Sequence, residues 1–418
     1  MKKAMLSLLL LPMVVFSVFA GGQQQAPRQQ RVEIEVFHFK VPWVDAWEDM
    51  TAEFEQDFPN ISVSSEIVGG AADWRTVLQT RFAAGLGPDI FIIEGQSDFE
   101  LWREFIAPMD DQPWVSKLLP IAKDAATFDG RIMAMPYNIE GYGYIYNKDI
   151  FRQVGITQPP RNYSELRAAA QRIQQAGITP FASGFGTWWV ISNHFTNIPF
   201  AQQPDPKQFI ADLNAGRTTI YQNEIFRQWQ RVFDLVLEFS EPNPLTTDHL
   251  TQTTMFALGD VAMIQQGNWR EPAIYQTNPD INMGFLPIAF NDDINQMNKI
   301  PVGIPFMFVV NNRVSAERQA AAFEFLNWMV TNSRAQRYIT EEFRSIPAFE
   351  GIPAGTLGEL SREILVFASE GRTIPWMFPR WPDGAVQEFA NIAQRYVAGQ
   401  LTFDAYLREL QRTWEALR

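Results

Sequence analysis

Residues Met135–Phe151, MPYNIEGYGYIYNKDIF, form a run rich in tyrosine and glycine with one carboxylate, Glu140, at its entrance. The run predicts a buried β-strand, because strands covered on both faces carry apolar residues at nearly every position. A buried carboxylate without a partner would cost several kcal/mol. We therefore expect Glu140 either to lie at the wall of a crevice or to be regularly paired with another group.

Strand and helix patterns alternate around this stretch. Alternating apolar residues predict a strand over residues 31–39, and apolar residues three or four apart predict a helix over 45–58. A strand over 61–68, a helix over 74–84 and the apolar strand 90–93 follow. Strand-helix-strand units are typical of a parallel sheet, so the fold class is α/β.

Three later helices have clear N-terminal caps. Asn162 is the expected N-cap of a helix with Glu165 as its capping-box partner, and Gly177 is the expected stop. Ser315 caps a second helix and Thr402 a third. The apolar stripe of the third helix is expected to comprise Phe403, Tyr406, Leu407, Leu410, Trp414 and Leu417.

The 418 residues exceed the usual size of one core, so two or three lobes are expected. Residues 1–20 carry two lysines, a short apolar stretch and Ala20, which predicts a secretory signal peptide cleaved near Ala20, followed by a flexible linker over 21–31. A membrane anchor is the alternative, but the apolar stretch is shorter than the roughly 20 residues a span needs. The absence of cysteine excludes disulfides and thiol chemistry, which favours the periplasm.

Composition and motifs exclude several functions. The net charge of −13 disfavours nucleic acid and anionic lipid. His38, His194 and His249 are isolated, and residues 291–298 lack the glycine and final glutamate of a calcium loop, so no metal site is predicted. No phosphate-binding glycine motif occurs, and Ser183 lacks the leading glycine of a nucleophile elbow. We expect no cofactor and no catalytic residue.

Aromatic residues gather in segments that do not have the pattern of amphipathic helices. The chain has 13 tryptophans and 33 phenylalanines. The segments contain Trp43, Trp188, Trp189, Trp269, Trp376, Phe378 and Trp381. A single tryptophan is more often part of a core, but the group together suits the apolar faces of sugar rings.

Four segments, in this order, resemble the family 1 extracellular solute-binding proteins of ABC importers. They are GLGPDIFIIEG (85–95), DGRIMAMPYNIEGYGYIYNKDIFRQVGI with PPRNYSELRAAAQRIQQAGITPFA (129–182), FALGDVAMIQQGNW (256–269) and FLNWMVTNSRAQ (325–336). The resemblance implies two α/β lobes joined by hinge segments around a ligand cleft. It places lobe 1 at 32–138 and 298–335, lobe 2 at 139–290, and lobe 2 with C-terminal helices at 336–418. The chain is expected to cross between lobes near 138–141, near 286–298 and within 331–344.

The resemblance also implies the binding residues. Glu140 would lie at the hinge floor, exposed to the cleft, and Trp269 matches the stacking tryptophan of the family. The expected ligand-binding residues are Phe39, Lys40, Trp43, Glu94, Gln96, Tyr137, Glu140, Trp188, Trp189, His194, Asn268, Trp269, Trp376, Arg380 and Trp381. The chain departs from maltose binders at Phe39-Lys40-Val41 and at Ile93, so a sugar other than a maltodextrin is expected.

The expected function is the capture of a sugar or oligosaccharide by a periplasmic monomer that delivers it to the membrane permease of an ABC importer. One alternative is a glycoside hydrolase or lyase that uses Glu140 with a second carboxylate, such as Glu94 or Asp98. Another is a binding protein for a polyamine or peptide, which would hold cations among aromatic rings. A purely structural role is the third alternative.

Overall fold

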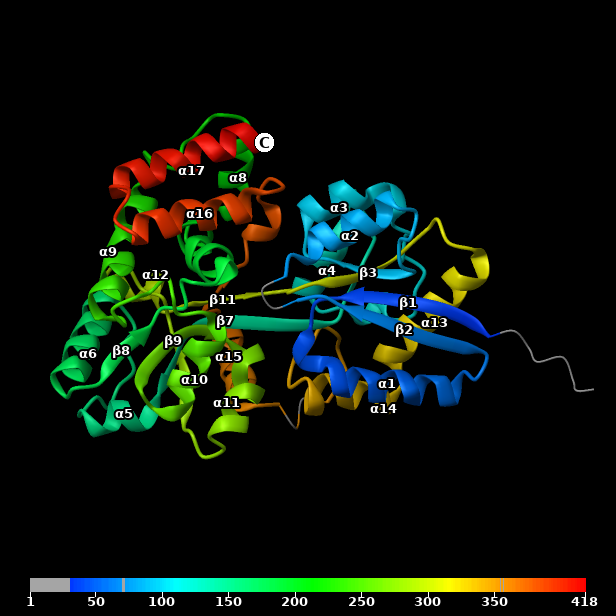
Figure 1. Cartoon of the computed structure of the whole chain (residues 1–418), viewed down its shortest axis with the longest axis horizontal. Helices are drawn as coiled ribbons and strands as arrows, with labels where there is room; N and C mark the ends of the chain where they lie inside the picture. Colours follow the sequence, from blue (N-terminus) through cyan, green and yellow to red (C-terminus); the bar gives the residue numbers. More distant parts are fainter. Residues whose placement is uncertain (1–30, 70–71, 354, 356) are drawn as a thin grey trace, which may run out of the picture.

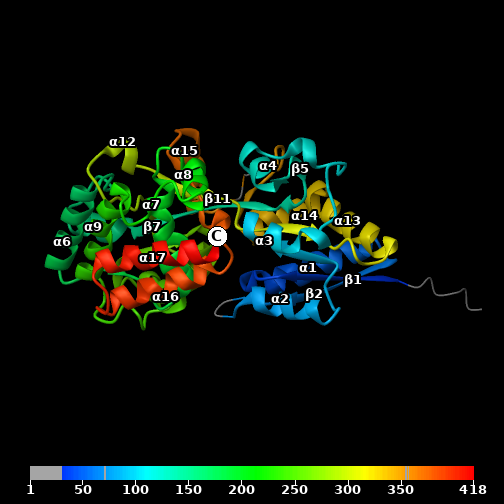
Figure 2. The same ribbon diagram turned by 90° about the horizontal axis from the view of Figure 1, so that it is seen from above.

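The molecule consists of two α/β lobes that lie side by side and are joined by strands running from one to the other (Figures 1 and 2). The computed structural model describes residues 31–69, 72–353, 355 and 357–418. The expected signal peptide and all of the expected linker except Arg31 lie outside these residues. Each lobe contains one main sheet, with the strand order β2-β1-β3-β12-β6 in the first and β14-β11-β7-β9-β8 in the second.

The first lobe begins with the expected strand-helix-strand unit. β1 pairs in parallel with β2 from Val32 opposite Ile61 to His38 opposite Ile67. α1 packs its apolar stripe, with Trp47, Met50 and Phe54, on this sheet and leaves its charged face in solvent. The elements of this lobe are β1 (Val32–His38), α1 (Val44–Asp57), β2 (Ile61–Ile67), α2 (Trp74–Ala83), β3 (Ile90–Ile93), α3 (Gln96–Trp102), α4 (Pro120–Ala126), β4 (Thr127–Phe128), β5 (Arg131–Ile132), β6 (Met135–Pro136), β12 (Met307–Val310), α13 (Ala316–Thr331) and α14 (Ser333–Arg337).

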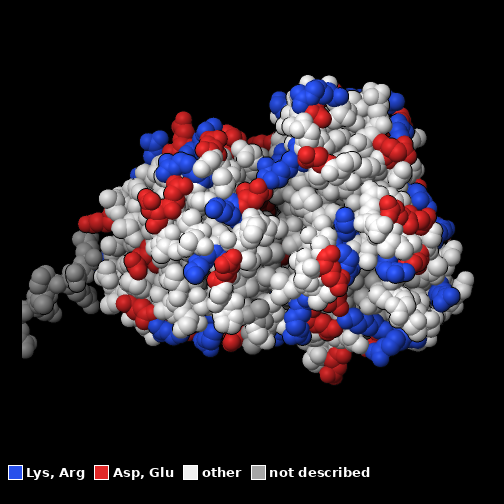
Figure 3. Space-filling model, turned by 180° about the vertical axis from the view of Figure 1, so that it is seen from behind, with Lys and Arg blue, Asp and Glu red and all other residues white. Residues whose placement is uncertain are grey.

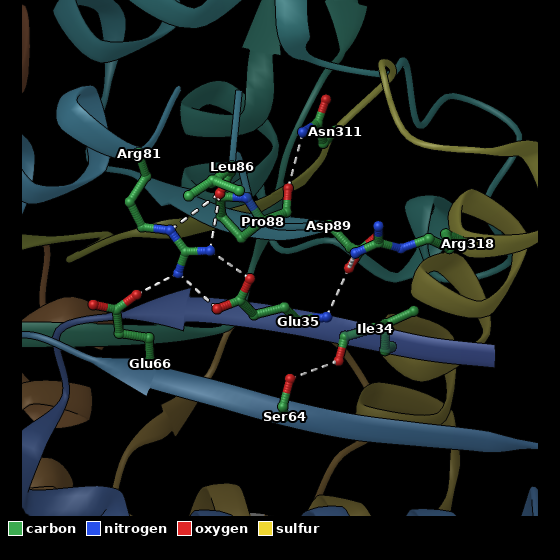
Figure 4. Close-up of polar contacts among 10 residues, drawn as sticks. All are labelled: Ile34, Glu35, Ser64, Glu66, Arg81, Leu86, Pro88, Asp89, Asn311 and Arg318. Carbon is green, nitrogen blue, oxygen red and sulfur yellow. Dashed lines mark hydrogen bonds and ion pairs between the residues drawn. The ribbon is translucent and has the colours of Figure 1, made fainter. Parts of the chain in front are cut away.

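The Gly-Pro-Asp turn before β3 holds the first lobe together through Asp89 (Figure 4). Asp89 Oδ2 accepts a hydrogen bond from the backbone nitrogen of Glu35 in β1 at 2.7 Å and pairs with Arg318 Nη2 in α13 at 2.5 Å. Asn311, just after β12, donates to the carbonyl oxygen of Pro88 at 2.9 Å. The turn therefore joins a strand, a helix and an antiparallel neighbour that are distant in sequence.

The second lobe is built around β7, which contains the stretch that carries Glu140. β7 is buried at every position and pairs with β9, β10, β11 and β13 (Ile346–Pro347), all antiparallel to it. The elements are β7 (Asn138–Asn147), α5 (Lys148–Gln153), α6 (Tyr163–Gln175), β8 (Thr179–Ala182), α7 (Asn197–Ala201), α8 (Pro206–Asn214), α9 (Glu224–Phe239), α10 (His249–Leu258), β9 (Val261–Gly267), α11 (Glu271–Thr277), β10 (Met283–Leu286), α12 (Ile294–Met297), β11 (Ile300–Gly303), α15 (Glu359–Ser369), β14 (Thr373–Pro375), α16 (Ala385–Val397) and α17 (Phe403–Leu417).

The alternation of glycine and tyrosine in β7 follows from its two faces. Successive side chains in a strand point to opposite faces, and the tyrosines at 142, 144 and 146 all join the core of the second lobe. The other face is crowded by backbone and by α15. A Cβ on Gly143 would come 2.5 Å from the carbonyl oxygen of Leu286, and one on Gly141 would come 2.9 Å from Ile364. Glycine on this face lets its neighbours approach the strand closely.

The three expected helix caps are present. Asn162 Oδ1 accepts from the backbone nitrogen of Glu165 at 2.9 Å, although the Glu165 carboxylate bonds the nitrogen of Arg161 rather than that of Asn162. Ser315 and Thr402 cap α13 and α17. The expected stripe of α17 is buried except at Leu417, which is 39% exposed because it lies in the last turn of the chain.

The passages between lobes differ from the expected boundaries. The first lies at Tyr137, between β6 and β7. The second lies at 304–306, later than the expected 286–298, because β11 still pairs with β7. Residues 338–350 contact the first lobe on both sides of β13, which pairs with the first two residues of β7. After β13, the carbonyl oxygen of Ala348 accepts from the nitrogen of Leu119 in the first lobe, so the third passage follows residue 350 rather than falling within 331–344. The strands that decide these passages have two to four residues and carry little sequence pattern.

Candidate ligand-binding cleft

The edge of the first lobe that faces the second carries a buried lysine. Lys40 lies just after β1, and its Nζ is 5.4 to 5.6 Å from the ring centroids of Phe39, Trp43 and Phe306. Lys40 Nζ also lies 2.5 Å from Glu140 Oε1, which belongs to β7 and thus to the other lobe. The three rings and the carboxylate therefore enclose the ammonium group.

Glu140 is paired within the chain. It is 3% exposed and accepts hydrogen bonds from Lys40 Nζ and from Asn138 Nδ2 at 3.0 Å. The expectation that Glu140 is exposed to the cleft is wrong in this structure, because the lobes meet at this point and bring Lys40 against it. Of the two possibilities set by its burial, the paired carboxylate is the one observed.

Five side chains of the second lobe form an aromatic cluster at the same edge. The cluster consists of Tyr142, Trp189, His194, Trp269 and Trp376. The imidazole of His194 stacks on Tyr142 with ring centroids 4.4 Å apart and lies 5.0 Å from Trp269. The rings of Trp269 and Trp376 meet edge to face at 6.3 Å. The three tryptophans keep part of their surface exposed.

Glycines make room for two of these rings. A Cβ on Gly267 would lie 2.1 Å from the ring of Trp269, and one on Gly303 would lie 2.6 Å from the ring of Trp376. Gly267 ends β9 and Gly303 ends β11, so the two rings lie over the ends of the two strands that flank β7 in one sheet. The rings are thereby fixed by the backbone, which lowers the entropy lost when a ligand stacks on them.

Several polar atoms around the cluster have no hydrogen-bond partner among the described residues. They are Asn138 Oδ1, Asn193 Oδ1, His194 Nδ1, Arg270 Nε and Trp376 Nε1. Burial, followed by the charges of Arg270 and Lys40, lowers the pKa of His194 to about 3, so the imidazole is neutral at neutral pH. The cleft edge therefore offers both donors and acceptors beside flat apolar rings.

The carboxylates at this edge are already engaged by cations. Glu94 and Asp98 both pair with Arg75, and the backbone nitrogen of Glu94 donates to Asp98 Oδ2 at 2.8 Å. Burial raises the pKa of Glu94 above its usual value. Glu140 is paired with Lys40. This arrangement supplies no free pair of carboxylates for hydrolysis, and the aromatic cage that could take a cationic ligand holds Lys40.

A hollow of about 290 Å³ lies between the lobes. Its lining includes Glu94, Gln96, Trp376 and Arg380, which are four of the expected ligand-binding residues. Asp124 of the first lobe closes its rim by pairing with Lys207 Nζ at 2.9 Å and Arg380 Nη2 at 3.7 Å in the second lobe. Figure 3 shows the surface notched between the two lobes, with charges of both signs along the notch. Another hollow, of about 690 Å³, is lined by Pro272, Tyr275, Gln276, Pro279, Glu341, Glu342 and Arg344 and contains none of the expected residues.

Some expected residues belong to the core instead. Tyr137 is fully buried against Trp43, which itself stacks on Phe343 at 4.1 Å. Trp381 is 1% exposed and packs on Phe200 and Phe389. Single tryptophans in short segments give no sign in the sequence of whether they face a cleft or a core.

Two other expected residues lie near the cleft in different roles. Asn268 accepts from the nitrogen of Gly141 at 3.1 Å and donates to Ser361 at 2.9 Å, so it braces the hinge strand. Trp188 is half-buried against the core of the second lobe. The segment that carries it is helical, because a π-helical turn spans Val190–Thr196, whereas the sequence indicated no helix there.

Sequence reasoning missed Asp124, which lines the hollow, and three residues near it: Phe306 beside Lys40, Asn193, and Arg270 beside Trp189. Phe306 and Asp124 lie in segments that contain no expected site residue, and only folding brings them to the edge. Asn193 directly precedes the expected His194, so its position was a usable signal. Arg270 directly follows Trp269, so its position next to the predicted stacking residue was a usable signal. In the described ranges, no three His, Asp or Glu side chains are placed to hold a metal ion, and no helix has the length and apolar character of a membrane span.

The chain is similar to known solute-binding proteins over most of its length. The family model for bacterial extracellular solute-binding proteins matches residues 41–336. An uncharacterized ABC transporter extracellular-binding protein of Pyrococcus horikoshii is 26% identical over 90% of this chain and 87% of its own. The maltotriose-binding protein of Pyrococcus abyssi is 20% identical over 74% of this chain and 64% of its own. The structure of a chitin oligosaccharide binding protein superposes with a TM-score of 0.79 at 19% identity, covering 93% of this chain and 99% of that one.

The alternative of a glycoside-active enzyme is not supported, because these relatives are binding proteins and the carboxylates it requires are paired with cations. The match to the family model covers well over half of the sequence, and the two lobes have the architecture of the solved neighbour. The chain belongs to the family of bacterial extracellular solute-binding proteins.

Proposed function

We propose that this protein captures a sugar or oligosaccharide between its lobes and delivers it to the transmembrane permease of an ABC importer. The observation that carries the proposal is the aromatic cluster together with the unpartnered polar atoms in and beside it. A sugar ring has apolar faces bordered by hydroxyls, so it requires both features at once. The names of relatives that bind maltotriose or chitin oligosaccharide support the ligand class.

Capture would follow from the two lobes moving about the hinge strands. In an open form the cluster would be reached from solvent. Closure would then add contacts from the first lobe, among them Glu94 and Gln96. The ligand shifts the balance between open and closed forms only by its preference for the closed form. Lys40 with Glu140, and Asp124 with Lys207, join the lobes in this structure and would favour closure.

The ligand is proposed to be a sugar other than a maltodextrin. Where the maltose binders of the family carry an acidic residue after the first strand, this chain has Lys40, whose ammonium group is held by Glu140 and three rings. A micromolar dissociation constant corresponds to about −8 kcal/mol. A few stacked rings and hydrogen bonds of the kind present here can supply that free energy.

Isothermal titration of the mature protein with mono- and oligosaccharides, polyols, amino acids and polyamines tests the proposal. We expect one sugar class to bind with one site per chain and with no turnover. The Trp269→Ala variant should lose most of this binding, whereas the core variant Trp381→Phe should keep it. Binding of polyamines or peptides alone would refute the sugar assignment.

We further propose that the protein is exported to the periplasm by cleavage near Ala20 and acts there as a monomer. Mass spectrometry of the protein secreted by a bacterial host would detect a mature N-terminus at Gly21. Light scattering should give one chain per particle with and without sugar. An uncleaved, membrane-bound product would contradict the export proposal.

A further inference from the structure

Arg270 is a buried cation without a partner in the described part of the chain. Lys40 and Arg270 are the two lysine or arginine residues that this part buries, at 8% and 9% exposed. Lys40 is neutralised by Glu140, and the half-buried Arg75 by Glu94 and Asp98. Among these same residues, Arg270 forms no ion pair, and its buried Nε has no hydrogen-bond partner. Removing a charge from water without compensation is costly.

Arg270 lies beside the aromatic cluster. Its Cζ is 5.9 Å from the ring centroid of Trp189, whose ring is 6.5 Å from that of Trp269. Trp269 and Arg270 both belong to the short helical turn Asn268–Arg270, which directly follows β9. Arg270 therefore lies beside the tryptophans on which a sugar ring would stack.

The groups around Arg270 do not supply the missing negative charge. His249 and His194 are neutral at neutral pH, because burial and then the charge of Arg270 lower their pKa values to about 4 and about 3. Asp248 is exposed, caps α10 through the backbone nitrogens of Leu250 and Thr251, and forms no ion pair with Arg270. Burial lowers the pKa of Arg270 to about 10, so the guanidinium remains charged at neutral pH.

We propose that Arg270 binds the carboxylate of a hexuronic acid unit, and that the ligand of this cleft is an acidic saccharide. This inference rests on the proposed function and specifies its substrate class. The carboxylate of a hexuronic acid projects from the edge of the ring, so a ring stacked on the tryptophans can direct it at the guanidinium. A guanidinium matches a carboxylate through two parallel hydrogen bonds. A neutral hydroxyl would occupy a donor but would leave the buried charge uncompensated.

The net charge of −13 does not oppose this assignment. Exposed charges are largely screened beyond about 10 Å at 0.1 M salt. The charged groups next to Arg270 are its own guanidinium and the exposed carboxylate of Asp248, which forms no ion pair with it, while the two histidines are neutral. Selectivity for an anion therefore depends on this one side chain.

Calorimetric titration with matched ligands tests the inference. The probes are digalacturonate and a glucuronate-containing disaccharide, each with its methyl ester and the neutral disaccharide of the same linkage. We expect at least one acid to bind 10-fold or more tightly than its ester. Arg270→Gln should abolish this preference by bringing the acid to within 3-fold of its ester, and Arg270→Lys should retain part of it. Arg344→Gln, a half-buried arginine outside the cluster, is the matched control and should leave the preference intact.

A melting curve of the ligand-free protein separates binding from structure. Arg270→Gln removes an uncompensated buried charge, so its melting temperature should equal or exceed that of the parent. A lower melting temperature with an unchanged ratio of acid to ester affinity would make Arg270 a structural residue and overturn the inference. If neutral sugars bind and no acid binds more tightly, the inference fails while the sugar-binding function stands. If no sugar of either kind binds, both fail.

Discussion

The ion pair between Lys40 and Glu140 should couple the two lobes energetically. Its side chains are 10% and 4% exposed, so each charge depends on the other for compensation. Removing one partner of a buried pair costs about 3–5 kcal/mol. At about 2–4 °C per kcal/mol for units of 150–250 residues, Lys40→Met or Glu140→Gln should lower the melting temperature of the ligand-free protein by at least about 6 °C.

The double variant Lys40→Met with Glu140→Gln separates the energy of the interaction between the two side chains from the contribution of each side chain alone. Methionine can fill the space among Phe39, Trp43 and Phe306, and glutamine can keep the hydrogen bond from Asn138. The double variant should therefore regain most of the lost stability, with a coupling energy of about 2 kcal/mol or more in a cycle of urea unfolding measurements. If each single variant lowers the free energy of unfolding by less than about 1 kcal/mol, which is the range typical of exposed ion pairs, the reasoning is refuted.

Three other predictions follow from the same geometry. Trp269→Ala removes a central stacking ring, and sugar affinity should fall roughly 30-fold, about 2 kcal/mol, by calorimetry; a change below 3-fold contradicts the site. Asp124→Asn breaks the exposed rim pairs with Lys207 and Arg380 and should weaken binding no more than about fivefold, with the difference lost in 1 M NaCl. The free energy of unfolding should fall as the pH decreases from about 6.5 towards 4, by roughly 1.4 kcal/mol per pH unit per histidine, because the unfolded chain binds protons that the buried imidazoles do not bind. Urea midpoints that do not change between pH 7 and pH 5 would contradict this prediction. The histidines are His38, His194 and His249, with pKa values lowered by burial to about 3, 3 and 4.

The elements with strong local patterns were predictable. β1, α1 and β2 follow from alternating and helical spacing of apolar residues, and their parallel pairing follows from the helix between them. The caps at Asn162, Ser315 and Thr402 were predicted because a cap is a contact over three residues. The second and third passages between lobes were placed wrongly, since strands such as β11 and β13 are too short to show a pattern.

The candidate site was only partly predictable for the same reason. Trp189, His194, Trp269 and Trp376 come from three separate segments, and their rings do meet. Trp381 belongs to the same kind of segment but packs in the core. Exposure of a tryptophan depends on what the rest of the chain places over it, which a single sequence does not contain.

The α/β class, the resemblance to a two-lobed family and the need of a carboxylate in a buried strand for a partner all follow from the sequence alone. The folded structure was needed to show that the partner of Glu140 is Lys40, 100 positions earlier, and that Arg270 forms no ion pair among the residues the structure describes. Local patterns record contacts between near neighbours, which fix periodicity and caps. Whether a buried charge has a partner depends on groups that come into contact only when the lobes come together, so it is a property of the folded molecule.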